Sequence, residues 1–108
     1  MTPATAMAQT EIRAEDGTFL GDINSDRFDP NSICNRFGVY GNRFGDGIWS
    51  AYGAYGMRSA DSAYDRNARK PPRLIDQRSR RTIGRLSKNT RLRNSTDPDV
   101  LRIQTCGE

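Results

Sequence analysis

The chain has 108 residues, of which 34% are hydrophobic and 28% are charged, so it can form one small domain with a limited core. It carries 17 Lys and Arg residues against 13 Asp and Glu residues, and it contains two cysteines and no histidine. Without histidine, Ser-His and Cys-His catalytic pairs and the usual His/Cys zinc sites are excluded. No apolar run approaches the ~20 residues that cross a bilayer, so we expect no integral membrane span.

Residues 1–9 end in a pattern that resembles a signal-peptide cleavage site. Ala6-Met7-Ala8 precedes Gln9 as Ala-x-Ala, although a basic and an apolar region are missing before it. We therefore expect residues 1–9 to be a signal-peptide remnant or disordered, and the protein to be secreted or periplasmic. If the Ala-x-Ala match is fortuitous, the protein is cytoplasmic.

Two stretches, 11–23 and 73–86, are predicted to form related β-hairpins. In the first, strand-like runs flank Asp16-Gly17, and an Asp-Gly pair between such runs is a strong hairpin signal. The second has a similar pattern with a polar turn, and we expect the two hairpins to pack together. A shift of 63 positions aligns Ile12 with Ile75, Leu20 with Ile83 and Gly21 with Gly84.

An Asp-Pro step follows each predicted hairpin, at Asp29-Pro30 and at Asp97-Pro98. Asp at the N-cap with Pro at the first helical position is typical of a helix start. We expect a helix of about two turns from residue 29 that ends by Gly38. Residues 87–108 are expected to form a basic, mobile loop and a C-terminal tail, whose apolar residues 100–103 dock on the domain.

The segment between the hairpins, 28–64, is rich in aromatic residues and glycine. Within it, Phe37-Gly38-Val39-Tyr40-Gly41 returns fifteen residues later as Tyr52-Gly53-Ala54-Tyr55-Gly56. The glycines lack the context of a phosphate loop, so we assign them to turn geometry. The rings are expected to pack inward, because the chain has few aliphatic residues. Alternatively, Tyr40, Trp49, Tyr52 and Tyr55 form a surface stripe that binds a partner.

The two cysteines, Cys34 and Cys106, are candidates for one disulfide. In an exported protein they would close a loop of roughly 70 residues, which the chain-entropy model makes worth on the order of 4 kcal/mol. In a reducing cytosol the same residues would be free thiols. The compartment therefore decides their role.

The run Asp22-Ile23-Asn24-Ser25-Asp26 has the opening spacing of a calcium loop. Arg27, however, stands where such a loop needs glycine, and Ile33 stands where it needs glutamate. We interpret these residues as polar strand-end residues, and we expect no metal and no cofactor.

Positive charge is concentrated in the second half of the chain. Residues 66–93 hold eleven basic residues and one acid, Asp76. Such a region is either a solvated face or a surface that binds polyanions, such as nucleic acid or acidic polysaccharide. The candidates for polyanion binding are Arg66, Arg69, Lys70, Arg73, Arg78, Arg80, Arg81 and Arg85.

Several of these motifs together resemble a family of small, uncharacterised bacterial exported proteins. The resemblance is carried by residues 16–24, by residues 28–35 and by the two aromatic-glycine units, in the sequences DGTFLGDIN, FDPNSICN, FGVYG and YGAYG. It covers roughly residues 11–90. It implies export and a repeat architecture, and it brings no known activity.

The sequence thus predicts a small, mainly β, loop-rich domain over residues 10–86, in which two related hairpins are bridged by an irregular aromatic-glycine segment with short helical turns. We expect a non-enzymatic, exported binding or structural protein of the bacterial cell envelope. Its partner would be another envelope protein or an anionic polymer. The alternative is a protein that binds nucleic acid or another acidic polymer through residues 66–93.

Overall fold

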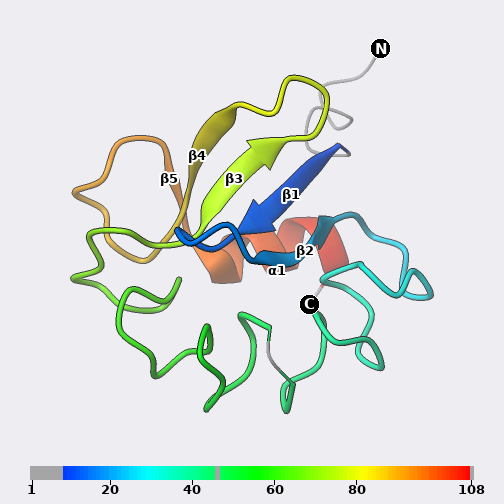
Figure 1. Ribbon diagram of the computed structural model, residues 1–108. Helices are drawn as coiled ribbons and strands as arrows, with labels where there is room; N and C mark the ends of the chain where they lie inside the picture. Colours follow the sequence, from blue (N-terminus) through cyan, green and yellow to red (C-terminus); the bar gives the residue numbers. More distant parts are fainter. Residues whose placement is uncertain (1–8, 46, 108) are drawn as a thin grey trace.

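The computed structural model describes residues 9–45 and 47–107 (Figure 1). In this part of the chain a five-stranded sheet, a long turn-rich segment and one C-terminal helix form a mainly β, loop-rich domain, as predicted. The signal-peptide remnant expected at residues 1–9 lies almost wholly outside the described residues. The elements are β1 (Thr10–Arg13), β2 (Phe19–Ile23), β3 (Arg73–Asp76), β4 (Thr82–Leu86), β5 (Ser95–Thr96) and α1 (Pro98–Cys106).

The sheet has the strand order β2-β1-β3-β4-β5. Both predicted hairpins form, as β1–β2 and as β3–β4, and they meet through an antiparallel pairing of β1 with β3. The short β5 adds to β4 in parallel. The turn of the first hairpin contains Gly17 at a φ of 91°, a conformation that glycine adopts without strain.

Each hairpin contains a β-bulge at the same place. Ile12 pairs with Gly21 in the first hairpin and Leu74 pairs with Gly84 in the second, and in both the residue before that glycine has no partner in the register. The shift of 63 positions therefore aligns β2 with β4 correctly. It is wrong by one residue for β1, because Ile12 corresponds to Leu74 and not to Ile75. The second hairpin has one more residue between these paired positions.

The segment between β2 and β3 folds into consecutive turns, and we call residues 29–68 the turn ribbon. Over residues 29–38 and again over 53–68, the N–H of every third residue donates to the carbonyl three residues earlier. The turn positions are occupied by small residues or by residues that favour turns. They are Asp29, Ser32, Asn35 and Gly38 in the first run, and Gly53, Gly56, Ser59, Ser62, Asp65 and Ala68 in the second.

The helix expected from residue 29 to Gly38 is wrong, because the chain forms this series of turns instead. The side chain of Asp29 accepts the N–H of Asn31 at 2.8 Å, and that of Ser32 accepts the N–H of Cys34 at 2.9 Å. Such local bonds give the backbone an alternative to the helical ladder.

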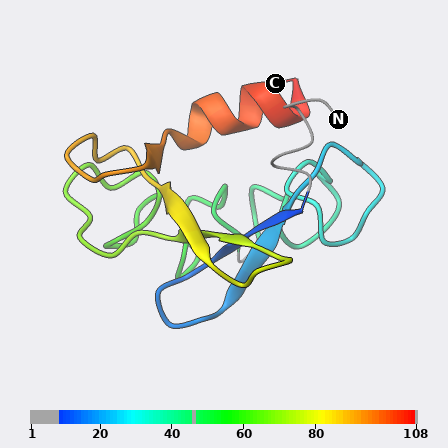
Figure 2. The same ribbon diagram turned by 90° about the horizontal axis from the view of Figure 1, so that it is seen from above.

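The second Asp-Pro step does begin a helix. Asp97 is the N-cap of α1, where its side chain accepts the N–H of Asp99 at 2.8 Å, and Pro98 takes the first position. Gly107 ends the helix in the left-handed conformation and donates its N–H to Ile103. Figure 2 shows α1 along one side of the molecule, with the hairpin turns on the opposite side.

The core consists of aliphatic side chains, Trp49 and the two cysteines. Ile12, Leu20, Ile48, Trp49 and Leu86 are each at most 1% exposed, and they come from β1, β2, the turn ribbon and β4. The turn ribbon therefore contributes to the same core as the sheet.

Candidate functional site

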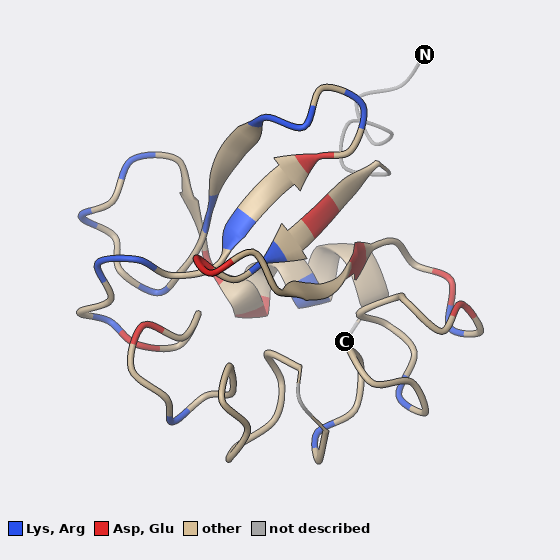
Figure 3. Ribbon diagram, viewed as in Figure 1, with Lys and Arg blue, Asp and Glu red and all other residues tan. Residues whose placement is uncertain are grey.

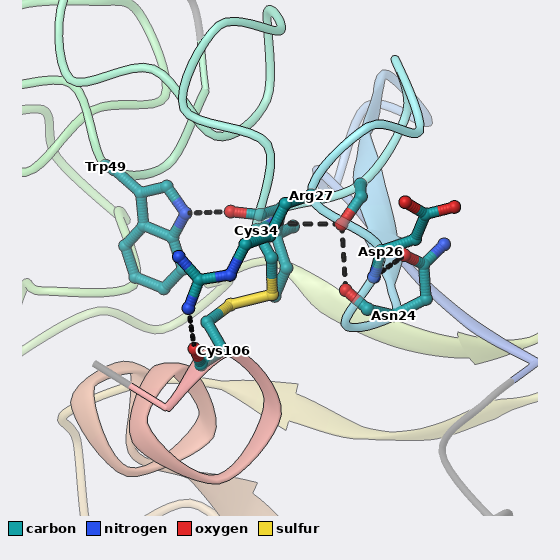
Figure 4. The surroundings of a disulfide bond; sticks show 8 residues. Asn24, Asp26, Arg27, Cys34, Trp49 and Cys106 are labelled. Atoms are coloured by element: carbon teal, nitrogen blue, oxygen red, sulfur yellow. Dashed lines mark hydrogen bonds between the residues drawn. A yellow bond between two sulfur atoms is a disulfide. The ribbon is translucent and has the colours of Figure 1, made fainter.

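The predicted pair Cys34–Cys106 forms a disulfide that joins the turn ribbon to the C-terminal end of α1 (Figure 4). The two residues are 72 positions apart in sequence, their Cα atoms are 5.4 Å apart, and both are buried. Two hydrogen bonds support this junction. The indole Nε1 of Trp49 donates to the carbonyl of Ile33 at 3.1 Å, and the guanidinium of Arg27 donates to the carbonyl of Cys106 at 2.7 Å.

Three turns that are close to Cys34 in the sequence have the same residue pattern and the same geometry. They are Asp26-Arg27-Phe28, Asn35-Arg36-Phe37 and Asn42-Arg43-Phe44, and we call them the Arg-Phe turns. In each, the Asp or Asn side chain accepts the backbone N–H of the Phe, at 2.9, 3.0 and 2.7 Å respectively. This Asx turn fixes the local backbone. The phenylalanines are 92%, 97% and 92% exposed, in the same order.

The expectation that the aromatic rings pack inward is therefore wrong for the three phenylalanines of these turns and for Tyr52, which is 82% exposed. The physical reason is that isoleucine and leucine side chains from the sheet and the ribbon, together with Trp49, already fill the core. The Arg-Phe turns were missed in the sequence. Their signal was present, because the pattern Asx-Arg-Phe occurs three times within residues 26–44.

The four residues proposed as a partner-binding stripe lie in different environments. Trp49 is in the core, Tyr40 and Tyr55 are half-buried, and Tyr52 is exposed. The ring of Tyr40 packs edge-on against Phe19, with the ring centres 5.0 Å apart. These contacts leave Tyr52 as the open member of the set.

A hollow of about 390 Å³ is bounded by the second and third Arg-Phe turns and by α1. It is lined by Arg36, Gly41, Asn42, Arg43, Phe44 and Arg102. Three guanidinium groups beside an aromatic ring suit an anionic group that is attached to an apolar one. Gly41 is required here by close approach, since a Cβ atom would overlap the backbone carbonyl oxygen of Asn35.

The eight basic residues proposed for polyanion binding gather at two ends of the β3–β4 hairpin, as the blue segments of Figure 3 show. Arg78, Arg80 and Arg81 are exposed in the hairpin turn, Arg66, Arg69 and Lys70 are exposed before β3, and Arg73 and Arg85 are half-buried in the strands. Arg85 donates to Glu15 at 2.8 Å, and this hydrogen bond lowers the pKa of the Glu15 carboxyl group. It also donates to the carbonyl of Pro71 at 2.8 Å.

A second hollow, of about 230 Å³, lies between the β1–β2 loop and the turn ribbon. Its carboxylates already accept hydrogen bonds from the protein. Asp16 accepts from the N–H of Thr18 and from the hydroxyl of Tyr55, which lowers its pKa, and Asp61 accepts from the N–H of Arg69. These bonds tie the loop to the ribbon and indicate a structural junction.

A third cluster connects α1 to the rest of the domain. The ammonium group of Lys88 lies 2.6 Å from one oxygen of Asp99, and the hydroxyl of Tyr64 donates to the other at 2.8 Å. The hydrogen bond from Lys88, followed by that from Tyr64, lowers the pKa of Asp99. Burial raises the pKa of Tyr64, so its hydroxyl remains a donor at neutral pH.

Within residues 9–45 and 47–107, no cluster of three or more metal-binding side chains is found. Nor does this part of the chain contain a helix that is long and apolar enough to cross a membrane. Comparison with protein-family models, with curated proteins and with solved structures finds no match to this chain.

Proposed function

We propose that this protein is a non-enzymatic binding or structural protein that acts outside the cytoplasm, in the cell envelope of a bacterium. The observation that carries this proposal is the buried Cys34–Cys106 disulfide, which joins two segments 72 residues apart. Disulfides form and persist in oxidising compartments and are rare in the cytosol. The Ala6-Met7-Ala8 pattern in the sequence supports the same compartment.

Most of the carboxylates with a shifted pKa favour a binding role over catalysis, and Asp22, whose pKa burial raises, is the exception. Glu15, Asp16 and Asp99 accept hydrogen bonds from arginine, tyrosine, lysine or the backbone, and these bonds lower their pKa values. A general acid or base that works near neutral pH needs a pKa raised toward that range. These carboxylates are instead held ionised as structural acceptors, whereas the exposed Arg-Phe turns offer a surface for a partner.

Thiol trapping in the native cells tests the compartment. Cells are quenched with a maleimide reagent before lysis, and labelling of the protein is read by mass spectrometry. We expect the wild-type protein to be labelled only after reduction, and a Cys34→Ser variant to be labelled at Cys106 without reduction. Free thiols in the wild-type protein, or recovery of the protein from the cytosolic fraction, would contradict the proposal.

The exposed arginines of the β3–β4 turn favour a second candidate function, which is polyanion binding. Arg78, Arg80 and Arg81 stand together at the end of the hairpin, where counterions would be released on contact with a polymer of negative charges. We expect retention on heparin that falls steeply with salt and that drops when all three become alanine. Unchanged retention of that variant would contradict polyanion binding at this turn.

A further inference from the structure

Each Arg-Phe turn exposes a side chain that has no polar atom. Phe28, Phe37 and Phe44 are all more than nine-tenths exposed, although the Asx turns hold their backbone in fixed positions. A rigid turn that carries an exposed phenylalanine loses little conformational entropy when the ring is covered. The same arrangement occurs three times, which distinguishes it from a single exposed ring.

The three turns belong to one edge of the molecule. Residues 24–45 run from β2 along a single side of the domain as a row of loops, drawn light blue to green in Figures 1 and 2. Val39, which is 52% exposed, adds to the apolar surface of this segment. The backbone of the three turns therefore follows one rim of the molecule, and the phenylalanines that they carry are exposed.

An arginine precedes each phenylalanine. Guanidinium groups bind phosphate oxygens in a bidentate manner, and apolar rings enter the boundary between lipid headgroups and acyl chains. Arg36 and Arg43 also line the hollow beside Phe44, which places positive charge where a headgroup phosphate would lie. At the second and third turns, the cations and the ring that line this hollow match the two layers of a membrane surface.

We propose that the Arg-Phe turns dock this protein on an anionic lipid surface, with Phe28, Phe37 and Phe44 entering the interface and with Arg36 and Arg43 contacting lipid phosphates. This inference rests on the proposed function, because a protein of the cell envelope faces membranes. A lipid surface is favoured over single-stranded nucleic acid for two reasons. Nucleic acid is bound in grooves that follow its backbone, whereas these rings project from a rim, and an oxidising compartment is bordered by lipid.

The turns differ in charge, and this difference gives a sharp test. Asp26 occupies the Asx position in the first turn, whereas the third has Asn42 there, and both side chains accept the phenylalanine N–H. Asp26→Asn and Asn42→Asp therefore keep the accepting oxygen and change only the charge. On anionic vesicles we expect about fivefold tighter binding for Asp26→Asn and about fivefold weaker binding for Asn42→Asp.

The experiment is co-sedimentation of the full chain, with its disulfide intact, with vesicles of phosphatidylcholine alone or with added phosphatidylglycerol. We expect binding to the phosphatidylglycerol vesicles, and a loss of about tenfold for each Phe→Ala substitution at the three turns. Ile83→Ala and Ile103→Ala are the controls, because these exposed apolar residues lie outside the turns and should leave binding unchanged. Circular dichroism checks that each variant is folded.

Several outcomes would overturn the inference. The first is absence of binding to both vesicle types. The second is binding as tight as that of the wild type by the variant that lacks all three phenylalanines. The third is a change in affinity of the two charge variants that is the same for phosphatidylcholine vesicles as for vesicles with phosphatidylglycerol. Binding of oligothymidylate without vesicle binding would assign the turns to nucleic acid instead. If the triple variant fails to fold, the single substitutions and the charge pair still decide. Free thiols in native cells would refute the exported role, whereas vesicle binding is read independently of the compartment.

Discussion

Removal of the disulfide is the perturbation whose size follows most directly from the structure. Replacing Cys34 and Cys106 by alanine opens a loop that spans 72 positions of the sequence. The chain-entropy relation for a loop of this length gives a loss of roughly 4 kcal/mol at 25 °C. Because small domains are stable by about 5–15 kcal/mol in total, the variant is expected to lose between about a quarter and four fifths of its unfolding free energy.

The structure also indicates where the loss begins. The helix α1 has nine residues, which is shorter than the ~12–15 residues that an isolated helix needs in water. Its buried residues are Pro98, Leu101 and Cys106. Without the bridge, α1 is held by buried Pro98 and Leu101, by the hydrogen bond from Arg27 and by the partly exposed contacts of Asp99, so we expect it to detach before the sheet unfolds.

Urea unfolding, followed by the fluorescence of Trp49 and by circular dichroism, measures both effects. With a urea m-value of about 2 kcal/mol per molar, a loss of 4 kcal/mol lowers the midpoint by about 2 M. Wild-type protein reduced by dithiothreitol should behave like the double variant. A difference in unfolding free energy below about 1 kcal/mol would refute the reasoning, because it would show that the bridge constrains neither the unfolded chain nor α1.

Three further perturbations have defined outcomes. Gly56→Ala should lower the unfolding free energy by about 3 kcal/mol, because the added methyl group would overlap a backbone carbonyl oxygen. Gly17→Ala has free space around it and should cost only about 1 kcal/mol of backbone strain. Thermal unfolding of the two variants measures the difference. Asp99→Asn should make the unfolding free energy less dependent on pH in acid. The pKa of Asp99 is lowered, so its pairing with Lys88 stabilises the fold fully above the ordinary carboxyl pKa, and this stabilisation is lost as the pH falls through the lowered pKa. If the urea midpoint of the variant depends on pH in the same way as that of the wild type, the prediction is contradicted. Trp49→Phe should cost about 2 kcal/mol in calorimetry, because it leaves a buried carbonyl unpaired; a cost near zero would show that the indole N–H contributes nothing.

Short motifs in the sequence predicted the local structure correctly where the residues next to them favour the same structure. The Asp-Gly turn and the alternating runs predicted the first hairpin, and the related pattern predicted the second. The two Asp-Pro steps show the limit of such signals. After Pro98 come Leu101, Arg102 and Gln104, which are good helix formers, whereas after Pro30 every third residue favours a turn. The cap is the same, and the residues that follow decide the outcome.

The candidate site was predictable only in part. The disulfide followed from the presence of two cysteines, given an oxidising compartment. Which rings are buried could not be predicted, because the residue type of an aromatic side chain is the same in the core and in solvent. Trp49 is buried because the packing of the ribbon on the sheet leaves space for its ring, whereas the ring of Phe37 is left in solvent. This difference depends on contacts between residues far apart in the sequence. The fifteen-residue echo did have structural meaning, because Gly41 and Gly56 both approach the backbone of the residue six positions earlier.

The three-residue hydrogen-bond spacing of the turn ribbon gives this part of the chain a natural unit of length. An insertion of three residues adds one turn, and every side chain beyond it keeps its direction relative to the sheet. An insertion of one or two residues moves Trp49 or Ser62 out of phase with the core that they contact. The ribbon is therefore expected to tolerate changes of length in triplets.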